Sequence, residues 1–282
     1  MYQVIKSLNN NGIVARCLET QEEYIFIGKG IGFSRKTEDT FESIPEAKIY
    51  KLQESIQKND DLGILNNVDP VYLDIANDII LLAEKRFGNF DSSILLSLAD
   101  HIAFSIERQK NGLVLSNPLH LDIRILFAEE YEVAKEAVAV IEKYVGIVIS
   151  EEEVAYIAMH IHAALTKEHI HLSMSIVLLV EKFIKELESR YEFTIDQDSL
   201  SYSRLLTHIK YMIIRAYKKE ALHVDITPYI KSEFPKSYKV AEDLCKSLGE
   251  DIQCEFQETE ISYLAVHIER LQKRDKKQNS VD

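Results

Sequence analysis

The stretch EEEVAYIAMHI at residues 151–161 returns in altered form as ETEISYLAVHI at residues 258–268. Each copy ends in a histidine and an isoleucine, and the residue numbers of the two histidines, His160 and His267, differ by 107. Apolar residues recur in both stretches at the spacing of three and four that is typical of a half-buried helix. The recurrence of so similar a helical pattern predicts that a larger helical unit is present twice in the chain.

Two further pairs of segments share this offset. HIAFSIER at 101–108 matches HIKYMIIR at 208–215, and YEVAKE at 131–136 matches YKVAED at 238–243. Within each half, the numbers of the two matched histidines differ by 59. Because the period far exceeds the roughly 20–50 residues of solenoid repeats, the pattern predicts two homologous all-α bundles and not a solenoid.

The helical periodicity begins after about position 55, where glycine becomes sparse. Ser150 followed by Glu153 has the pattern of a capping box, in which each side chain bonds to the backbone at the other residue. The periodicity predicts helices at 72–88, 91–112, 130–146, 150–165, 171–190, 198–219, 236–249 and 257–275.

The N-terminal part of the chain, up to position 52, has a different pattern. Turn residues cluster in NNNG at 9–12 and in IGKGIGF at 27–33. Short alternating segments between such turns predict four strands, at 2–8, 13–18, 23–28 and 47–52. A unit this small has a marginal core alone, so we expect it to pair with a second copy. The predicted domains are 1–57, 65–170 and 171–282.

Charge and composition limit the function. Residues 1–52 hold seven basic and seven acidic residues, so the whole net charge of −13 lies in the remainder of the 282-residue chain. An acidic body repels nucleic acid, and only the N-terminal part is suited to contact a phosphate backbone. We see no apolar run long enough to cross a bilayer and no secretion signal. The three widely spaced cysteines argue against a disulfide framework or a cysteine zinc site and for a reducing cytoplasm.

The four matched histidines are the main chemical candidates: His101, His160, His208 and His267. A neutral imidazole is a nucleophile near neutral pH, and phosphoryl groups are among the electrophiles it accepts. For any one of these histidines alone, a hydrogen-bonded core residue is the simpler interpretation. Arg108 and Arg215 each follow a histidine by seven positions, on nearly the same helix face, where a guanidinium is able to meet an anion. A solvated cation near a helix end explains these arginines equally well.

Other chemistry is less well supported. A histidine-rich tract suggests a metal site, but residues two apart on a helix point about 200° apart, and Glu269 replaces His162 in the second half. The tract consists of His160, His162, Glu168, His169 and His171. No serine- or cysteine-hydrolase signature accompanies the histidines, and Asp100 corresponds to Thr207. We therefore expect no metal, no cofactor and no enzyme activity.

The turn clusters of the first domain suit RNA. The glycine cluster lacks the order of a phosphate-binding loop, but glycines allow a backbone to approach bases closely. Phe33 is suited to stack on an unpaired base, and the asparagines of the NNN turn to bond base edges. Four cations are candidates for phosphate contacts: Lys6, Lys29, Arg35 and Lys36. Turn formation by itself accounts for the asparagines and glycines equally well.

These segments together resemble the BglG/SacY family of bacterial transcriptional antiterminators, most closely its glucose-responsive branch. The resemblance rests on SLNNNGIVA, IGKGIGF, LADHIAFSIER, YIAMHIHAAL and YLAVHI, which occur in the family's order over essentially the whole chain. It implies a dimeric, four-stranded antiparallel sheet that binds a stem-loop in leader RNA and prevents a terminator from forming. The RNA contacts that it implies are Lys6, Asn9, Asn10, Asn11, Gly28, Lys29, Gly30 and Phe33.

The resemblance also implies that the two helical domains are regulated by the sugar phosphotransferase system. Phosphorylation falls on His101 and His160 in the first domain and on His208 and His267 in the second. The implied partners are the phosphocarrier protein HPr, the IIB domain of a sugar permease (enzyme II) and a second copy of the chain. In the family, the permease generally inactivates through the first domain, and HPr often activates through the second. The family pattern has an aspartate before the first histidine, as at Asp100, and Thr207 departs from it in the second domain.

Two other classes remain open at this point. A DNA-binding activator with the same regulatory domains needs a helix-turn-helix near the N-terminus, which the strand-like N-terminal part does not offer. A phosphotransfer enzyme would pass the phosphoryl group onward from the histidines, whereas a regulator would hold it in a stable, stoichiometric form.

Overall fold

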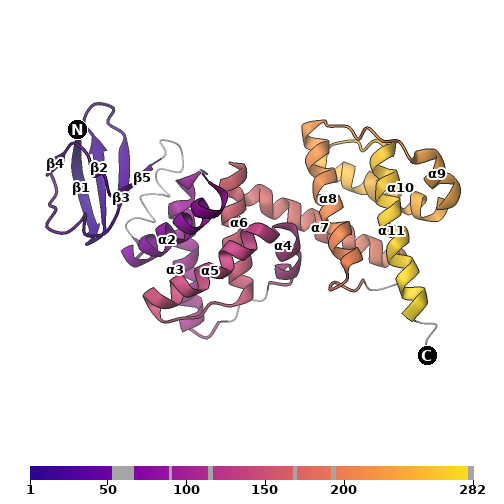
Figure 1. The fold of residues 1–282 in the computed structure, drawn as a ribbon, viewed down its shortest axis with the longest axis horizontal. Coiled ribbons are helices and arrows are strands. Elements are labelled where there is room, and N and C mark those ends of the chain that lie inside the picture. The colour runs from indigo at the N-terminus through magenta and orange to yellow at the C-terminus, as the bar shows by residue number, and fades with distance from the viewer. Residues whose placement is uncertain (53–66, 89–90, 114–116, 168–169, 192–194, 279–282) are drawn as a thin grey trace. The chain divides into compact units, whose positions relative to one another are not determined.

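The computed structural model describes residues 1–52, 67–88, 91–113, 117–167, 170–191 and 195–278 (Figure 1). They form two compact units. The first comprises Met1–Asn117 and Glu129–Ile170, and the second Pro118–Ala128 and His171–Asp282. The predicted domain limits at 57, 65 and 282 lie outside the described residues, as do Glu168, His169 and the side chain of His171 from the histidine-rich tract.

The N-terminal module is an antiparallel sheet in the order β4-β1-β2-β3-β5. Four of its strands lie within a residue or two of the predicted ones. The fifth, β4, pairs with the start of β1 and is too short for alternation to show in sequence. The strands are β1 (Tyr2–Asn9), β2 (Gly12–Cys17), β3 (Glu23–Ile27), β4 (Thr40–Phe41) and β5 (Lys48–Lys51). Residues 1–52 contain no helix, so a helix-turn-helix does not lie there.

One face of the sheet buries a small core. Val4, Ile13, Ala15, Phe26 and Phe41 are at most 9% exposed. The rings of Phe26 and Phe41 meet edge to face at 5.2 Å. Such aromatic pairs add stability beyond the area they bury, which a core of this size requires.

The helices of the first unit close around their own core. Helix α2 begins where the Asp69 side chain accepts a hydrogen bond from the Val71 amide at 3.0 Å, and it ends at Gly88 with a positive φ of 83°. Ser150 makes no side-chain cap, so the capping-box prediction is wrong. The helices are α2 (Pro70–Phe87), α3 (Leu95–Lys110, after a 3-10 turn at Ser92–Ile94), α5 (Ala128–Val145) and α6 (Glu151–Thr166).

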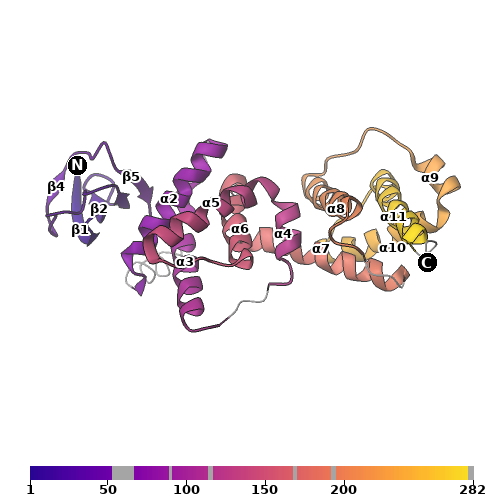
Figure 2. The same ribbon diagram turned by 60° about the horizontal axis from the view of Figure 1, so that its bottom comes forward.

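The second unit repeats this plan (Figures 1 and 2). The residue numbers of α10 exceed those of α5 by 107 at both ends, and so do those of α9 relative to α4. Helices α4 and α9 are not predicted from sequence periodicity, because each is too short for apolar residues to recur along one helix face. The unit comprises α4 (His120–Leu126), α7 (Ile170–Tyr191), α8 (Leu200–Lys218), α9 (Thr227–Glu233), α10 (Pro235–Ile252) and α11 (Glu258–Gln278).

Helix α4 belongs to the first repeat by sequence but lies in the second compact unit, where it contacts α8. The Tyr202 hydroxyl donates to Oδ1 of Asp122 at 2.6 Å, and the Lys210 ammonium donates to the carbonyl oxygen of Leu126. Burial raises the pKa of Asp122 above its usual range, although the bond from Tyr202 opposes this shift. Its counterpart α9 instead packs on α10 and α11 of its own repeat.

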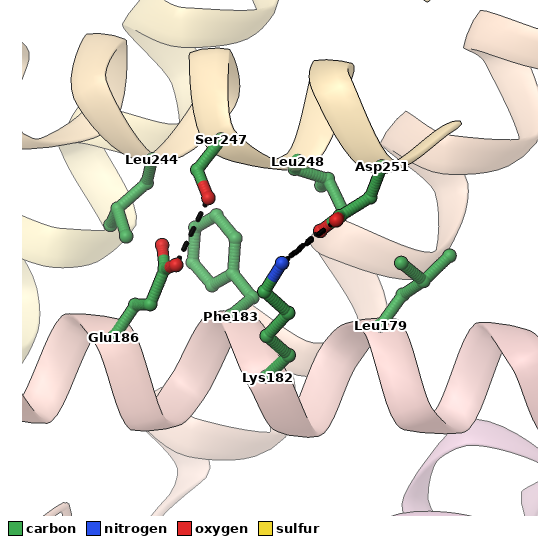
Figure 3. A pocket seen from close by; sticks show the side chains of 8 residues that line it. All are labelled: Leu179, Lys182, Phe183, Glu186, Leu244, Ser247, Leu248 and Asp251. Carbon is green, nitrogen blue, oxygen red and sulfur yellow. Dashed lines mark hydrogen bonds and ion pairs between the residues drawn. The ribbon is translucent and has the colours of Figure 1, made fainter. Parts of the chain in front are cut away.

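Helices α7 and α10 pack through an apolar centre flanked by polar pairs (Figure 3). The ring of Phe183 lies between the helices and is 3% exposed. The Lys182 ammonium donates to Oδ1 of Asp251 at 2.8 Å, and the Ser247 hydroxyl donates to Glu186 at 2.9 Å. Among the described helices, none combines the length and the apolar character that a bilayer crossing requires. All three cysteines are free.

Candidate functional site

The two turn clusters of the N-terminal module come together in the structure. The carbonyl oxygen of Asn11 accepts a hydrogen bond from the Gly28 amide at 2.8 Å, and its side-chain oxygen accepts one from the Gly30 amide at 3.1 Å. The Asn10 carbonyl accepts from the Gly32 amide at 3.0 Å. The NNN turn and the glycine segment are separate in the sequence, but these bonds make them one surface.

Three glycines of this segment have a structural reason to be glycine. A Cβ atom added to Gly28 would lie 2.9 Å from the carbonyl oxygen of Glu46. A Cβ atom added to Gly32 would lie 2.0 Å from the carbonyl oxygen of Asn9, which is far inside contact distance. Gly30 has a φ of +75°, a region that side chains disfavour. The close approach of the two turns therefore depends on glycine, independently of any RNA contact.

The predicted RNA contacts differ in exposure. The Phe33 ring is 70% exposed, which suits stacking on an unpaired base. Asn10, Lys29 and Gly30 are also exposed, as is Lys6 on β1. The remaining three, Asn9, Asn11 and Gly28, are partly buried.

The side chains of Asn9 and Asn11 are already engaged. Both amide groups donate to Oδ2 of Asp74 on α2, at 2.9 and 3.3 Å. Asp74 is 8% exposed, and its burial raises the pKa of the carboxyl group in spite of these two bonds. No sequence pattern singles out Asp74, because local periodicity does not connect residues so far apart in the chain.

Two more contacts join the sheet to the same helix. The Tyr50 hydroxyl donates to Oδ1 of Asn77 at 2.7 Å, and Lys48 forms a salt bridge with Glu84. Asp74, Asn77 and Glu84 follow the spacing of one helix face. In this conformation, that face of α2 covers part of the predicted RNA-binding surface.

The first pair of predicted histidines is brought together between α3 and α6. The ring centroids of His101 and His160 are 5.3 Å apart. His160 is 6% exposed, and burial, followed by the neighbouring His101, lowers its pKa to about 3. The His160 imidazole is therefore neutral at physiological pH, the form in which a ring nitrogen acts as a nucleophile.

The second pair repeats this arrangement between α8 and α11. The rings of His208 and His267 are stacked, with centroids 4.8 Å apart. Burial lowers the pKa of each to about 4, with smaller effects from Arg215 at His208 and from His208, Arg270 and Arg204 at His267. Both rings are therefore neutral near pH 7.

Each arginine that follows a histidine by seven positions meets a buried glutamate. Arg108 pairs with Glu153, whose other oxygen lies 3.3 Å from Nε2 of His101. Burial opposes ionisation of Glu153, but the contacts with His101 and Arg108 prevail and lower its pKa. Arg215 donates twice to Glu260, at 2.5 and 2.9 Å.

These two glutamates are site residues that were not predicted from the sequence. Glu153 and Glu260 occupy the same place in the repeated stretches 151–161 and 258–268, so the repeat itself is a sequence signal for them. A capping box with Ser150 is another explanation for a glutamate at position 153, but the structure shows no side-chain cap at Ser150.

His162 is held by a neighbour outside the histidine pair. Its Nδ1 atom lies 2.7 Å from Oε1 of Glu130. At the matching place in the second repeat, the Ser237 hydroxyl donates to Glu269 at 2.7 Å. The two repeats therefore have a polar pair at the same place, formed by different residues. Among the residues that the structure describes, no three His, Cys, Asp or Glu side chains are grouped to hold a metal ion.

The second histidine pair opens onto a pocket between α8 and α11. Its volume is about 400 Å³. The walls are lined by Leu200, Ser203, Arg204, Thr207, His208, Tyr211, Arg215 and His267. Both histidine rings therefore reach a space that is large enough for a small anion.

Comparison with known proteins finds two kinds of domain in this chain. The family model for the CAT RNA binding domain matches residues 2–59, and the model for the PRD domain matches residues 77–164 and 181–271. Protein GlcT of Staphylococcus aureus strain MRSA252 is 32% identical over 97% of this chain and 98% of its own length. The protein of the same name from strain bovine RF122 is 31% identical over the same shares.

A solved structure, the crystal structure of GlcT CAT-PRDI, is also similar. It is 37% identical, with a TM-score of 0.52, and the match covers 58% of this chain and 98% of that chain. Together, the two domain types and the full-length relatives place an RNA-binding module before two regulation domains. The chain therefore belongs to the BglG/SacY family of transcriptional antiterminators, which bind RNA and are regulated by the sugar phosphotransferase system.

Proposed function

We propose that the chain is a glucose-type antiterminator whose four paired histidines accept phosphoryl groups: His101, His160, His208 and His267. The observation that carries this proposal is the pairing itself. Each repeat holds two histidine rings close together, with centroids 5.3 Å apart in one and 4.8 Å apart in the other. Three of the four have a lowered pKa, which keeps them neutral and nucleophilic at physiological pH.

The helices around the first histidine pair must separate for transfer to occur. Nε2 of His101 and Nε2 of His208 are buried, and His160 is 6% exposed. At the first pair a phosphoryl donor reaches these nitrogens only when α3 separates from α6, whereas the rings of the second pair already line the pocket between α8 and α11. A phosphoryl group then adds about two negative charges where a neutral ring stood. Beside the buried carboxylate of Glu153, that charge opposes closure of the helices.

The N-terminal module binds a stem-loop of leader RNA and prevents the terminator from forming. Its exposed Phe33 and its NNN turn support this part of the proposal. The contacts are Lys6, Asn9, Asn10, Asn11, Gly28, Lys29, Gly30 and Phe33. The module acts as a homodimer, since a sheet with so small a core gains stability by pairing.

The phosphoryl donors are HPr and the IIB domain of a glucose-type permease. Sequence spacing makes Arg108 and Arg215 candidate partners of the transferred phosphate, but in this conformation each is paired with a buried glutamate. The chain acts in the cytoplasm as a regulator and not as an enzyme, with functional domains at 1–57, 65–170 and 171–282. Sugar uptake drains phosphate from the permease, the first regulation domain loses its phosphate, and the RNA-binding modules pair.

Site mapping tests the proposal. The full chain is incubated with the general phosphotransferase proteins, with and without the permease domain, and phosphohistidines are located by mass spectrometry. Stable labelling confined to the four paired histidines is expected. Labelling at His162, or at none of the four, would contradict it. A His101→Ala variant is expected to antiterminate without sugar, and continued repression would count against an inhibitory role.

RNA binding is tested separately. The full chain is titrated with its leader stem-loop and with a scrambled hairpin of equal length and charge. Preference for the stem-loop is expected to fall when Phe33 is replaced with alanine, because a stacked base is worth about 1–3 kcal/mol. Equal affinity for both hairpins would rule out this role of the module.

A further inference from the structure

The two histidine pairs sit in different electrostatic surroundings. At three positions around the second pair, the side chain is more positive or less negative than its counterpart in the first repeat. Arg204 stands where the first repeat has Ser97, and Thr207 stands where it has Asp100. In the same way, Arg270 takes the place of an alanine, at position 163. Every one of these differences favours an anion at the second pair.

The pocket wall presents this charge to the rings. Arg204 and both histidines line the pocket of about 400 Å³. Arg204 is exposed and forms no salt bridge with any residue in the described part of the chain. Nε2 of His208 is buried without a hydrogen-bond partner among the described residues. Arg215, by contrast, is already committed to Glu260.

We propose that this pocket is a dianion site, in which Arg204 binds the phosphoryl group carried by His208 or His267. The inference rests on the proposed function and names a residue of that site beyond the paired histidines. It assigns to Arg204 the role that sequence spacing suggested for Arg215, because Arg215 is neutralised by Glu260. The first repeat, with Ser97 in place of Arg204, lacks this site.

The transfer step balances without a further reactant. The unprotonated ring nitrogen attacks phosphorus, the bond from phosphorus to the donor nitrogen breaks, and the proton leaving the acceptor ring passes to the donor. Arg204 offers donors to the transferred oxygens, and a guanidinium matches phosphate geometry in two bonds. Asp100 in the first repeat would instead repel them.

A small chemical phosphoryl donor distinguishes an effect of Arg204 on the pocket itself from an effect on docking of a protein donor. The full chain is labelled with phosphoramidate and, in parallel, with phosphorylated HPr, and labelling of His208 and His267 is followed by mass spectrometry. Arg204→Ser is expected to slow labelling by about fivefold with both donors, the effect of losing one exposed charge at about 4 Å. Lys246→Ser removes the same charge from an exposed site outside the pocket and is expected to leave the rate unchanged.

Binding of inorganic phosphate provides a second readout that needs no transfer. Ring-proton resonances of His208 and His267 are expected to shift with phosphate in the parent chain and not in Arg204→Ser. Equal shifts and equal labelling rates in the two chains would overturn the inference. If the parent chain binds phosphate through Arg204 but is labelled by neither donor, the proposed phosphorylation fails while the anion site stands.

Discussion

The side-chain amide of Asn9 donates a hydrogen bond of 2.9 Å to Oδ2 of Asp74. Asn11 donates to the same oxygen at 3.3 Å. A carboxylate thus occupies two amide groups that are predicted to contact RNA, and it lies on the first helix of the first regulation domain. An amide hydrogen that bonds to Asp74 is not available to an RNA acceptor, so the two interactions compete.

Replacing Asp74 with alanine is expected to strengthen binding of the leader stem-loop by about tenfold. The change frees both amides and removes a negative charge near the RNA, and a hydrogen bond to a charged group is worth about 1.5–3 kcal/mol. Fluorescence anisotropy with a labelled stem-loop measures the affinity. Glu107→Gln, which removes one exposed charge from the same domain, is the control. Unchanged or weaker binding would contradict competition between Asp74 and the RNA for these amides.

Replacing Arg215 with methionine is expected to destabilise the second unit by about 3–5 kcal/mol, because Glu260 would keep a buried charge without its partner. The glutamate is 5% exposed. Urea denaturation of the full chain measures the loss. Adding Glu260→Leu is expected to restore most of it, since an apolar pair replaces the ion pair.

An exposed ion pair provides the matched control. Arg190 lies 3.6 Å from Asp243, and both side chains are 38% exposed. Arg190→Met is expected to cost about 1 kcal/mol or less. Equal losses for Arg190→Met and Arg215→Met would show that burial of Glu260 has no part in the effect.

The polar pair at His162 is expected to be interchangeable with its counterpart. His162→Glu alone places a second carboxylate beside Glu130 and is expected to destabilise the first unit. Adding Glu130→Ser recreates the pair that Ser237 and Glu269 form in the second repeat. Thermal denaturation is expected to show recovery in the double variant. No recovery would mean that surrounding packing, and not the pair, determines these residues.

Acid is expected to weaken the fold through the buried histidines. An unfolded histidine takes up a proton near pH 6.5, whereas the lowered pKa of folded His160 delays uptake to about pH 3. Between these values the unfolded state alone binds this proton, so the free energy of unfolding falls as the pH drops from about 6.5. Glu153, with its lowered pKa, adds to the loss only below about pH 4.5.

Proton uptake on unfolding isolates this contribution. At pH 5.5, His160→Gln is expected to take up about one proton fewer than the parent chain, because the group that titrates only when unfolded is gone. His223→Gln is the control, since this side chain is exposed to water in the folded chain. Identical uptake in His160→Gln and the parent chain would show that folded His160 is already protonated at that pH.

The sequence by itself determined the duplication, the order of the domains and the equivalence of the histidines in the two halves. These follow from local periodicity and from a constant offset of 107 in residue number, which need no knowledge of contacts. The strands of the first module followed from its turn residues, except for β4, which is too short to carry a pattern. Helices α4 and α9 were missed for the same reason.

Only the tertiary structure decided which side chains meet. It placed Asp74 against Asn9, Glu153 between His101 and Arg108, and helix α4 in the second compact unit. Such contacts join residues far apart in the chain, and they are selected by burial and by the need to satisfy buried polar groups. A linear pattern shows which residues share a helix face, but packing determines what that face touches.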